Sequence, residues 1–305
     1  MPLGAPLMRP SQIPKVNKRH LASIIHQLES RFPDSSDDVF LAYGLACELI
    51  RFFLGHDWTN SNVFQQAARN QSEGANFLKT RAANHDDRFR HQDRVVRLAE
   101  LLFNLQGIEG FQDRLGLIRT GNLEAAYAEL QCASHIARSS VEFRFVVPSG
   151  TRGLDFDAEI LPHQAPPIPV ELKSKAEETD LSSNTILSTL QAARRQLPPS
   201  TASLAFLKIP EHWVRDPAIA PEVTSALEEF FRNTSRVIAV VFRWEEWYFS
   251  PTGHGLILSK FRVEINPSSH HISSPVMEVL DMMRRPYSRA WTDLLSLATS
   301  AAVRR

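Results

Sequence analysis

The chain has 305 residues, of which 43% are hydrophobic and 22% are charged, a composition typical of globular domains. Lys plus Arg and Asp plus Glu both number 34, so an overall basic protein is excluded and any nucleic-acid contact requires a local basic surface. We find no signal-peptide pattern and no apolar run of membrane-spanning length, and therefore expect a cytoplasmic protein with no membrane partner.

The N-terminal part of the chain is predicted to be a tail followed by helices. Residues 1–18 are rich in proline and have no hydrophobic period, which indicates a flexible tail. Across residues 19–119, apolar side chains recur three and four positions apart, and β-branched runs are missing. This pattern predicts an all-helical N-terminal region without strands of its own. We expect that region to contact the substrate, a protein partner or a second copy of the chain.

One run inside the helical region, His85-Asp86-Asp87 with His91 beyond it, is reminiscent of metal phosphohydrolases built on helices. Such a site needs further His and Asp residues on other helices, and the sequence does not place them. Polar histidines outside metal sites are far commoner. The two cysteines, Cys47 and Cys132, have no metal-ligand spacing and are expected to be buried as small apolar residues.

Residues 120–265 alternate between helical and strand patterns, and residues 266–305 are predicted to be a C-terminal helical segment. The expected order is a helix, three strands, a helix, a strand, a helix, and a hairpin turned by Ser250-Pro251-Thr252-Gly253. The expected elements are the helix from Gly121 to Ala137, strands Val141–Val147, Leu154–Ile160 and Val170–Lys175, a helix ended by Pro198, strand Ala202–Ile209, a helix through Phe231, and the hairpin strands Val237–Phe249 and Leu256–Ile265.

The second and third of these strands carry the densest group of charged residues. Apolar and acidic residues alternate in Leu154–Ile160, which places Asp155, Asp157 and Glu159 on one face. In the next strand, Glu171, Lys173 and Lys175 alternate with apolar residues. If the two strands pair, the acids and lysines converge on one point. The alternative is a pair of amphipathic strands with a solvated outer face, which alternation alone would also produce.

These residues resemble the signature of the PD-(D/E)xK nucleases, the restriction-endonuclease-like superfamily. That signature is an acid on one strand followed by Glu-x-Lys or Asp-x-Lys on the next. Either Asp155 or Asp157 matches the first acid, and Glu171-Leu172-Lys173 matches the second part. The usual proline before the first acid is absent, so the choice between the two aspartates stays open. The resemblance covers roughly residues 120–250, and it implies an α/β fold with a mixed central sheet flanked by helices.

The resemblance also implies a metal site. Mg²⁺ or Mn²⁺ would be held by Asp157 and Glu171, with Asp155 and Glu129 as further ligands. Glu129 is preferred over Glu124 as the acid of the preceding helix, because it falls inside the apolar face, although a glutamate at the edge of that face would also reach water. Lys173 would contact the scissile phosphate or orient the attacking water.

Further residues are candidates for substrate binding. Lys175 shares the face of Lys173 and would bind substrate or neutralise the acids. Family members often add a polar residue from the next helix, for which this chain offers Gln191, Arg194, Arg195 and Gln196, with Gln191 the first choice. Every amphipathic helix exposes such residues, so a solvated helix face is the alternative.

The sequence therefore predicts a metal-dependent nuclease, with DNA as the expected substrate and endonucleolytic cleavage the expected mode. The alternative is a catalytically inactive protein of the same fold that binds or scaffolds, because a fold does not fix an activity. Two substitutions would separate the roles of neighbouring residues. Lys173→Ala is expected to remove cleavage and leave the fold intact, whereas Leu172→Asp is expected to unfold the core.

Overall fold

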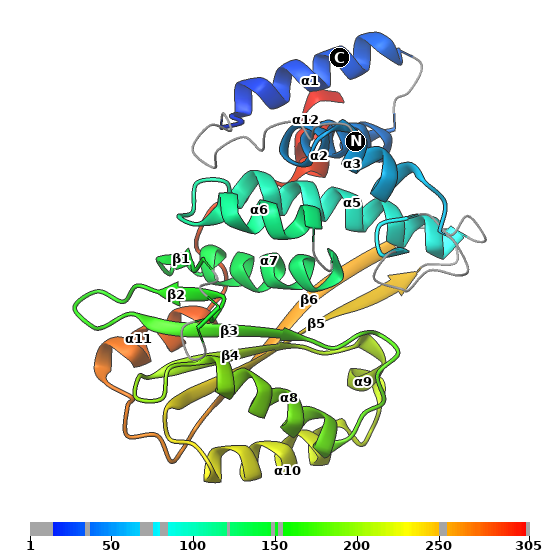
Figure 1. Ribbon diagram of the computed structural model, residues 1–305. Coiled ribbons are helices and arrows are strands. Elements are labelled where there is room, and N and C mark those ends of the chain that lie inside the picture. Colours follow the sequence, from blue (N-terminus) through cyan, green and yellow to red (C-terminus); the bar gives the residue numbers. More distant parts are fainter. Residues whose placement is uncertain are drawn as a thin grey trace, which may run out of the picture. The chain divides into compact units, whose positions relative to one another are not determined.

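The computed structural model describes residues 15–33, 37–67, 76–79, 85–120, 123–147, 150–151, 155–249 and 255–302. The chain is a mixed α/β protein with two compact units (Figure 1). Met1–Leu123 and Trp291–Arg305 form a helical unit, and Glu124–Ala290 forms a sheet unit. The segment 266–305, predicted as one C-terminal piece, is thus divided between the two units. Most of the predicted tail, Leu154 and the turn Ser250–Gly253 lie outside the described residues.

The described elements of the helical unit are all helices, as the 3.6-residue stripes predict. None of the described helices in the chain combines the length and apolar composition needed to cross a membrane. The helices of the unit are α1 (Lys18–Arg31), α2 (Asp38–Leu54), α3 (His56–Thr59), η2 (Asn60–Phe64), α5 (His85–Leu105), α6 (Phe111–Thr120) and α12 (Leu294–Ala302).

Helix α2 is the centre of this unit, and it packs against α1, α5 and α12. Its apolar residues recur at helical spacing, so Leu45, Leu49 and Ile50 are completely buried. The helix begins at Asp37, whose side chain accepts a hydrogen bond from Val39 N at 2.8 Å, and it ends at Gly55, which has a φ of 98°. Residues at each end of α2 therefore determine where the helix begins and ends, and its apolar residues determine how it packs.

His91 has a structural contact within this unit. Its Nε2 lies 2.9 Å from Tyr43 Oη, and its Nδ1 lies 2.7 Å from the Leu78 carbonyl oxygen. Burial lowers the pKa of His91, so the ring is neutral at pH 7. The side chain thereby ties α5 to α2 and to the segment around Leu78. The side chain of His85, the other histidine of the run, is outside the described atoms.

Glu100 predicts a pH dependence of stability for the helical unit. Its Oε1 accepts a hydrogen bond from Leu294 N at 2.9 Å, at the first turn of α12. Burial raises the pKa of Glu100 from 4.5 to about 7. The folded chain thus holds this proton to higher pH than the unfolded chain, and stability falls as pH rises from about 4.5 to about 7.

Glu100→Gln keeps the hydrogen-bond acceptor and removes the titration. We expect the variant to gain stability relative to the wild type as pH rises from 5 to 8, measured by urea unfolding of both proteins. Because the two chains differ at one residue, the titration of every other group cancels in the comparison. A difference in unfolding free energy that stays constant over this range would contradict the assignment.

The sheet unit holds a six-stranded sheet whose strands lie in the order β1-β2-β3-β4-β5-β6. Its strands are β1 (Phe143–Phe145), β2 (Ala158–Ile160), β3 (Ile168–Ser174), β4 (Ser203–Lys208), β5 (Val237–Phe249) and β6 (Gly255–Ile265). Its helices are α7 (Leu123–Arg138), α8 (Ser183–Gln196), α9 (Glu211–Arg215), α10 (Ile219–Arg232) and α11 (Ser274–Arg284). The predicted order of elements is confirmed, with α9 as an additional short helix.

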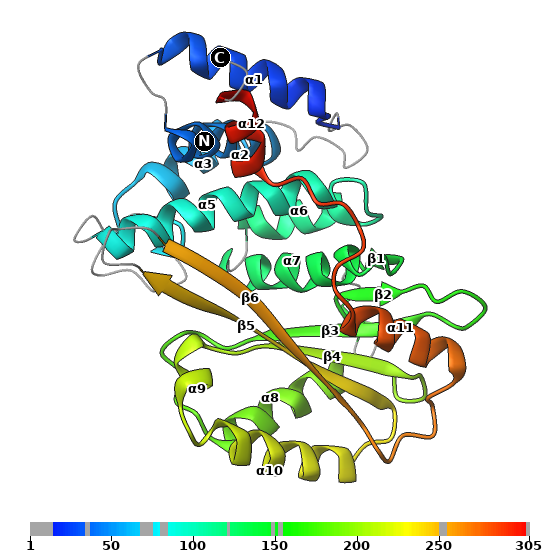
Figure 2. The same cartoon turned by 180° about the vertical axis from the view of Figure 1, so that it is seen from behind.

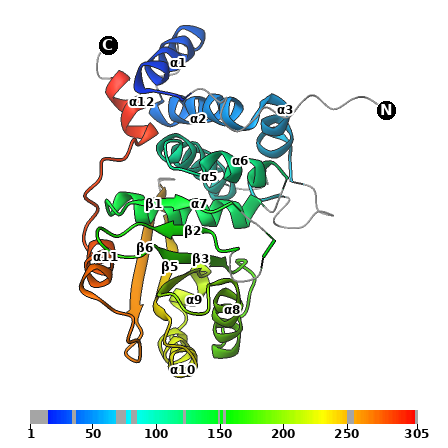
Figure 3. The same cartoon turned by 60° about the vertical axis from the view of Figure 1, so that its left-hand side comes forward.

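The sheet mixes two kinds of pairing. The β3–β4 and β4–β5 pairs are parallel, whereas the β1–β2, β2–β3 and β5–β6 pairs are antiparallel. The parallel pairs need crossover helices, which α8 and α10 supply. The predicted hairpin is present as the long β5–β6 pair, which crosses the sheet unit in Figure 2. Helix α11 packs beside β6 (Figure 3).

Helices cover both faces of this sheet, with α7 on one side and α8 and α10 on the other (Figure 1). On the α8 face, Ala205 and Leu207 pack with helix residues such as Ile186 and Phe230, all completely or almost completely buried. On the α7 face, the His135 ring packs at a tilt against Phe261, with ring centroids 4.1 Å apart. Period-two alternation therefore sends successive residues of each central strand into different surroundings.

Strand β5 extends beyond the end of β4, and α9 covers part of the edge that this exposes. The Glu211 carboxylate accepts a hydrogen bond from Trp247 N at 3.0 Å, and Arg215 Nη2 donates to Trp247 O at 3.1 Å. Glu211 and Arg215 also form an ion pair with each other. Trp213, in the same short helix, is completely buried, and its Nε1 donates to Thr179 O.

Candidate active site

The candidate site lies where β2 and β3 separate. Ala158 pairs with Val170, and Asp157, one residue earlier, lies close enough to Glu171, one residue later, to raise its pKa. Asp157 N still donates to Val170 O at 3.0 Å. The next ladder bond is replaced, because Leu172 N donates to the Asp157 side chain, at 2.8 Å from Oδ2. A carboxylate thus takes the position of a backbone acceptor at the point where the β2–β3 pairing ends.

Glu171 is the most deeply buried charged residue of the candidate site, with 1% of its surface exposed. It lies in register with Ala205 and therefore on the α8 face of the sheet. Its Oε1 forms an ion pair with Lys173 Nζ, two residues along the same strand. Neither carboxylate oxygen accepts a well-aligned hydrogen bond. A buried carboxylate normally accepts several such bonds, so the Lys173 ammonium is the main compensation that Glu171 has among the described residues.

The electrostatics of Glu171 follow from this position. Burial, reinforced by the charge of Asp157 and opposed by the Lys173 ammonium, raises the pKa of Glu171 to about 8. The charge of Glu129 on α7 also raises it, which places that carboxylate within electrostatic range. Two acids and one lysine, from α7, the residue before β2, and β3, therefore influence one buried group. Additional positive charge near Glu171 would lower its pKa and favour its ionised form.

Gln196, at the end of α8, holds Lys173 from the other side. Its Oε1 accepts a hydrogen bond from Lys173 Nζ, and its Nε2 donates to Asp155 O at 3.4 Å. One amide thus links the lysine to the backbone that leads into β2. The Asp155 side chain accepts from Gly150 N at 2.9 Å. The acid close to Glu171 is therefore Asp157, whereas Asp155 engages the loop before it.

The other substrate-binding candidates lie around the site rather than in contact with the acids. Gln191, the first choice on the helix, is half-buried, and Gln196 makes the contact to Lys173 instead. Arg194 Nη1 donates to Asn233 O at 2.7 Å, beyond the end of α10. Arg195 is exposed and Lys175 is half-buried, with Lys175 N bonded to Lys208 O. The physical reason is helical phase, because Arg194 and Gln191 leave α8 on other sides than Gln196.

The residues fit a hard divalent cation held by few protein ligands. Asp157 and Glu171 offer oxygens, and Glu171 lacks aligned partners. Mg²⁺ is commonly bound by one or two carboxylates and several waters, which needs no larger cluster. Within the described ranges, no group of three or more His, Cys, Asp or Glu residues is spaced to hold a metal ion. Asp155 and Glu129 thus form no three-residue cluster with these two acids.

Cys132 is unsuited to nucleophilic chemistry. It lies on α7 close to this site and is almost completely buried. Burial raises the pKa of its thiol to about 12, so the reactive thiolate is absent at pH 7. Both cysteines are free and buried, as expected from the sequence.

No family model, no curated protein and no solved structure matches this chain.

Proposed function

We propose that the chain is a metal-dependent nuclease of the PD-(D/E)xK type, with a restriction-endonuclease-like sheet unit, and that it hydrolyses phosphodiester bonds in DNA. The order of its elements supports this. A helix, an antiparallel β1–β2–β3 meander, a helix and a parallel β4 follow one another. The family signature falls at the corresponding place, with the acid before β2 and Glu-x-Lys within β3.

The observation that carries the proposal is the state of Glu171. A carboxylate that is 1% exposed, beside a second acid and with one lysine as its counter-charge, is costly for a fold to keep, and a bound cation would offset that cost. Asp157 and Glu171 would hold a divalent cation in the proposed site, and that cation would supply Lewis acidity to a bound water. Gln196 keeps the Lys173 ammonium directed toward the acids.

Lys173 has the chemistry that phosphate cleavage requires of a residue beside the acids. Its ammonium is a compact charge with three donors, of which the Glu171 and Gln196 contacts use two. The remaining donor is free to bind a phosphate oxygen or the attacking water. The Lys173 side chain is 27% exposed and can contact a substrate, whereas the Glu171 side chain is 1% exposed and cannot.

A second candidate function is a binding or scaffolding protein on the same fold. The Glu171–Lys173 ion pair favours it, because the lysine supplies an internal positive charge in the place where an active enzyme needs a metal. A cleavage assay discriminates the nuclease from the scaffolding protein. The substrates are linear, circular, single-stranded and branched DNA, each incubated with Mg²⁺, Mn²⁺ or a chelator. Cleavage that the chelator stops supports the nuclease. If no substrate is cleaved and calorimetry detects no metal binding, the binding or scaffolding function is supported instead.

Glu171→Gln should weaken binding of Mg²⁺ or Mn²⁺ by about tenfold or more, because it keeps the shape of the side chain and removes one ligand charge. Calorimetric titration with Mn²⁺ measures the effect directly, without requiring cleavage. Glu159→Gln is the matched control. Its carboxylate bonds to Arg144, at 2.7 Å from Nη2, on the neighbouring strand. Equal Mn²⁺ affinity for both variants would remove Glu171 from the metal site.

A further inference from the structure

A second group of polar and aromatic side chains lies on β5, beyond the part of the strand that pairs with β4. Trp244, Glu246 and Tyr248 alternate along the strand and so share one face. That face is the one that carries Phe242, which belongs to the core under α8 and α10. Pairing with β4 ends at Arg243, so this row continues past the covered sheet.

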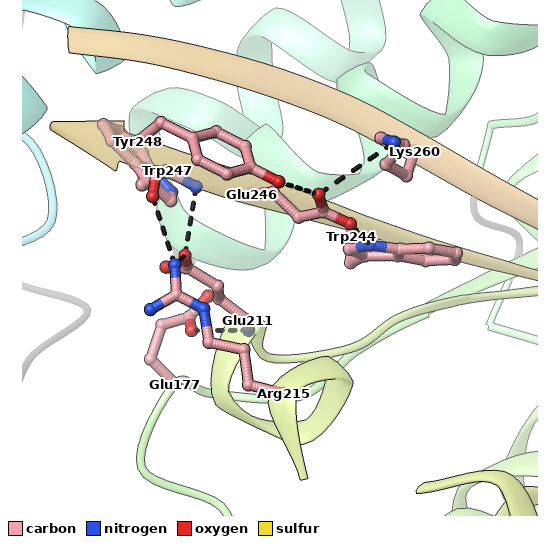
Figure 4. A network of polar contacts seen from close by, with 8 residues as sticks. All are labelled: Glu177, Glu211, Arg215, Trp244, Glu246, Trp247, Tyr248 and Lys260. Atoms are coloured by element: carbon pink, nitrogen blue, oxygen red, sulfur yellow. Dashed lines mark hydrogen bonds and ion pairs between the residues drawn. The ribbon is translucent and has the colours of Figure 1, made fainter. Parts of the chain in front are cut away.

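The two aromatic residues hold the carboxylate between them. Trp244 Nε1 donates to Glu246 Oε1 at 2.8 Å, and Tyr248 Oη donates to Glu246 Oε2 at 2.6 Å (Figure 4). These hydrogen bonds lower the pKa of Glu246, so the group is ionised at neutral pH. Each oxygen keeps a second lone pair for another donor. The figure shows the Tyr248 ring extending along the strand toward Glu246.

Two exposed cations, each ion-paired with a glutamate, lie beside this row on β6. On β6, Lys260 pairs with Trp244 and Arg262 pairs with Phe242, so both lie on the same face of the hairpin. Their side chains are 46% and 56% exposed, respectively. Lys260 Nζ lies 4.0 Å from Glu246 Oε2, and Arg262 forms an ion pair with Glu264. Tyr248 is 48% exposed.

We propose that this face of the β5–β6 hairpin binds a single-stranded segment of nucleic acid, with an unpaired base on the exposed ring of Tyr248 and phosphates on Lys260 and Arg262. The proposal deepens the proposed nuclease function and rests on it for the choice of nucleic acid as the ligand. Aromatic rings that stack bases beside cations that follow the backbone are the arrangement of single-strand binding surfaces. Lys260 and Arg262, two residues apart, lie roughly 7 Å from each other.

Glu246 gives this surface a chemical preference among bases. An ionised carboxylate accepts hydrogen bonds and donates none, so it favours a base edge that presents N–H groups. Cytosine offers its N4 amino group, and an unpaired guanine offers neighbouring N–H donors. Thymine offers a single ring N–H between two carbonyl oxygens, which a carboxylate repels. The surface should therefore bind cytosine- or guanine-containing strands more tightly than oligothymidine.

The surface also stands in a defined relation to the candidate active site. Lys173 is in register with Leu207, and Leu207 with Phe242, so these residues form a line across three strands. Trp244 lies two residues further along β5, roughly 12 Å from Lys173 by strand spacing. Both lie on the same face of the sheet. Leu207 and Phe242, which lie between them, belong to the core under α8 and α10.

Binding of fluorescein-labelled oligonucleotides by the full chain, in a chelator so that no cleavage occurs, tests the proposal. Oligocytidine and oligothymidine are compared with a blunt duplex. We expect the single strands to bind more tightly than the duplex, and Tyr248→Ala to weaken them about 5- to 100-fold, the usual effect of losing one stacked base. Tyr248→Phe keeps the ring and should stay near wild type. Glu246→Gln should reduce the preference for cytidine over thymidine.

Two controls keep the outcomes separable. Phe64→Ala removes an aromatic of the helical unit that is 43% exposed, and it should not change binding. Wild-type affinity of Tyr248→Ala for the oligonucleotides overturns the proposal. The proposal is also wrong if the surface around Tyr248 binds a short lysine peptide and does not bind the oligonucleotides. If the Tyr248→Ala protein binds like wild type and still cleaves DNA with Mg²⁺, the single-strand-binding proposal is wrong and the nuclease proposal is supported. If Tyr248→Ala loses binding and the wild type cleaves nothing, the single-strand-binding proposal is supported and the nuclease proposal is wrong.

Discussion

Replacing Lys173 with alanine should lower metal-dependent cleavage by about 10²–10⁴-fold, the usual effect of removing one positioned group that handles a proton or charge in the transition state. The reason is geometric. Lys173 is the accessible cation of the candidate site, held by Glu171 on one side and Gln196 on the other. Single-turnover cleavage with saturating Mg²⁺ measures the loss at the chemical step. Wild-type rates from folded Lys173→Ala protein would remove the lysine from the mechanism.

The same substitution should also cost stability, which the sequence alone did not predict. Lys173→Ala leaves Glu171 buried without its counter-charge, and breaking such a pair typically costs about 3–5 kcal/mol. Protonation of Glu171, whose pKa is already raised, offsets part of that cost. The double variant Lys173→Met with Glu171→Gln removes both charges at similar volume. It should regain stability in urea unfolding while remaining inactive, which separates the chemical role of the lysine from its structural one.

Arg144→Met is the matched control for this experiment. It removes a cation from an ion pair with Glu159 in the same sheet, where the Arg144 side chain is 42% exposed. Exposed pairs contribute about 0–1 kcal/mol, so both stability and cleavage should stay close to wild type. A loss of cleavage in Arg144→Met equal to that in Lys173→Ala would show that the assay responds to positive charge in general rather than to one position.

Leu172→Asp should unfold the sheet unit. Leu172 is 5% exposed and faces α7, next to Phe206 in the register of β3 and β4. A carboxylate in this position is buried, and burying one without a partner costs at least several kcal/mol, comparable to the whole stability of a typical domain. The nearest cation on that face of β4 is Lys208, which is already 3.6 Å from Glu177 Oε1.

Circular dichroism and urea unfolding measure this effect. Leu172→Met, which changes shape and keeps volume, should cost less than about 1.5 kcal/mol and retain activity. The contrast with Lys173→Ala is the informative part, because adjacent residues on opposite faces of one strand should separate packing from chemistry. A folded Leu172→Asp protein with the wild-type unfolding midpoint would show that the side chain does not face the core.

Local pattern was enough to predict most elements of the sheet unit. Alternation between apolar and acidic residues correctly made β2 and β3 neighbours, and the β-branched run at Val237 correctly predicted the long hairpin. Helix α9 was missed, because five residues between Pro210 and Asp216 carry no measurable period. Its position depends on burying Trp213, a tertiary contact that no local pattern reports.

The candidate site shows the same division between local and tertiary information. Placing Glu171 beside Lys173 needs only the period of a strand, and the sequence predicted it. Choosing Asp157 over Asp155 needs the register of β2 against β3, which only the structure supplies. Gln196, and not Gln191, contacts Lys173, because the orientation of α8 on the sheet turns Gln196 toward β3. Helix periodicity in the sequence does not define the orientation of a helix relative to a separate strand.

The division of the chain into units has a consequence for its biosynthesis. Helix α2 belongs to the first part of the chain, yet its residues Leu41 and Ala42 pack against Ala298 of α12, which follows the whole sheet unit in sequence. At a translation rate of about 5–20 residues per second, this partner emerges roughly ten seconds or more after α7 begins. During that interval Leu41 and Ala42 of α2 lack the contact that Ala298 supplies in the folded chain. The nascent chain therefore exposes this apolar part of α2 until α12 has been made.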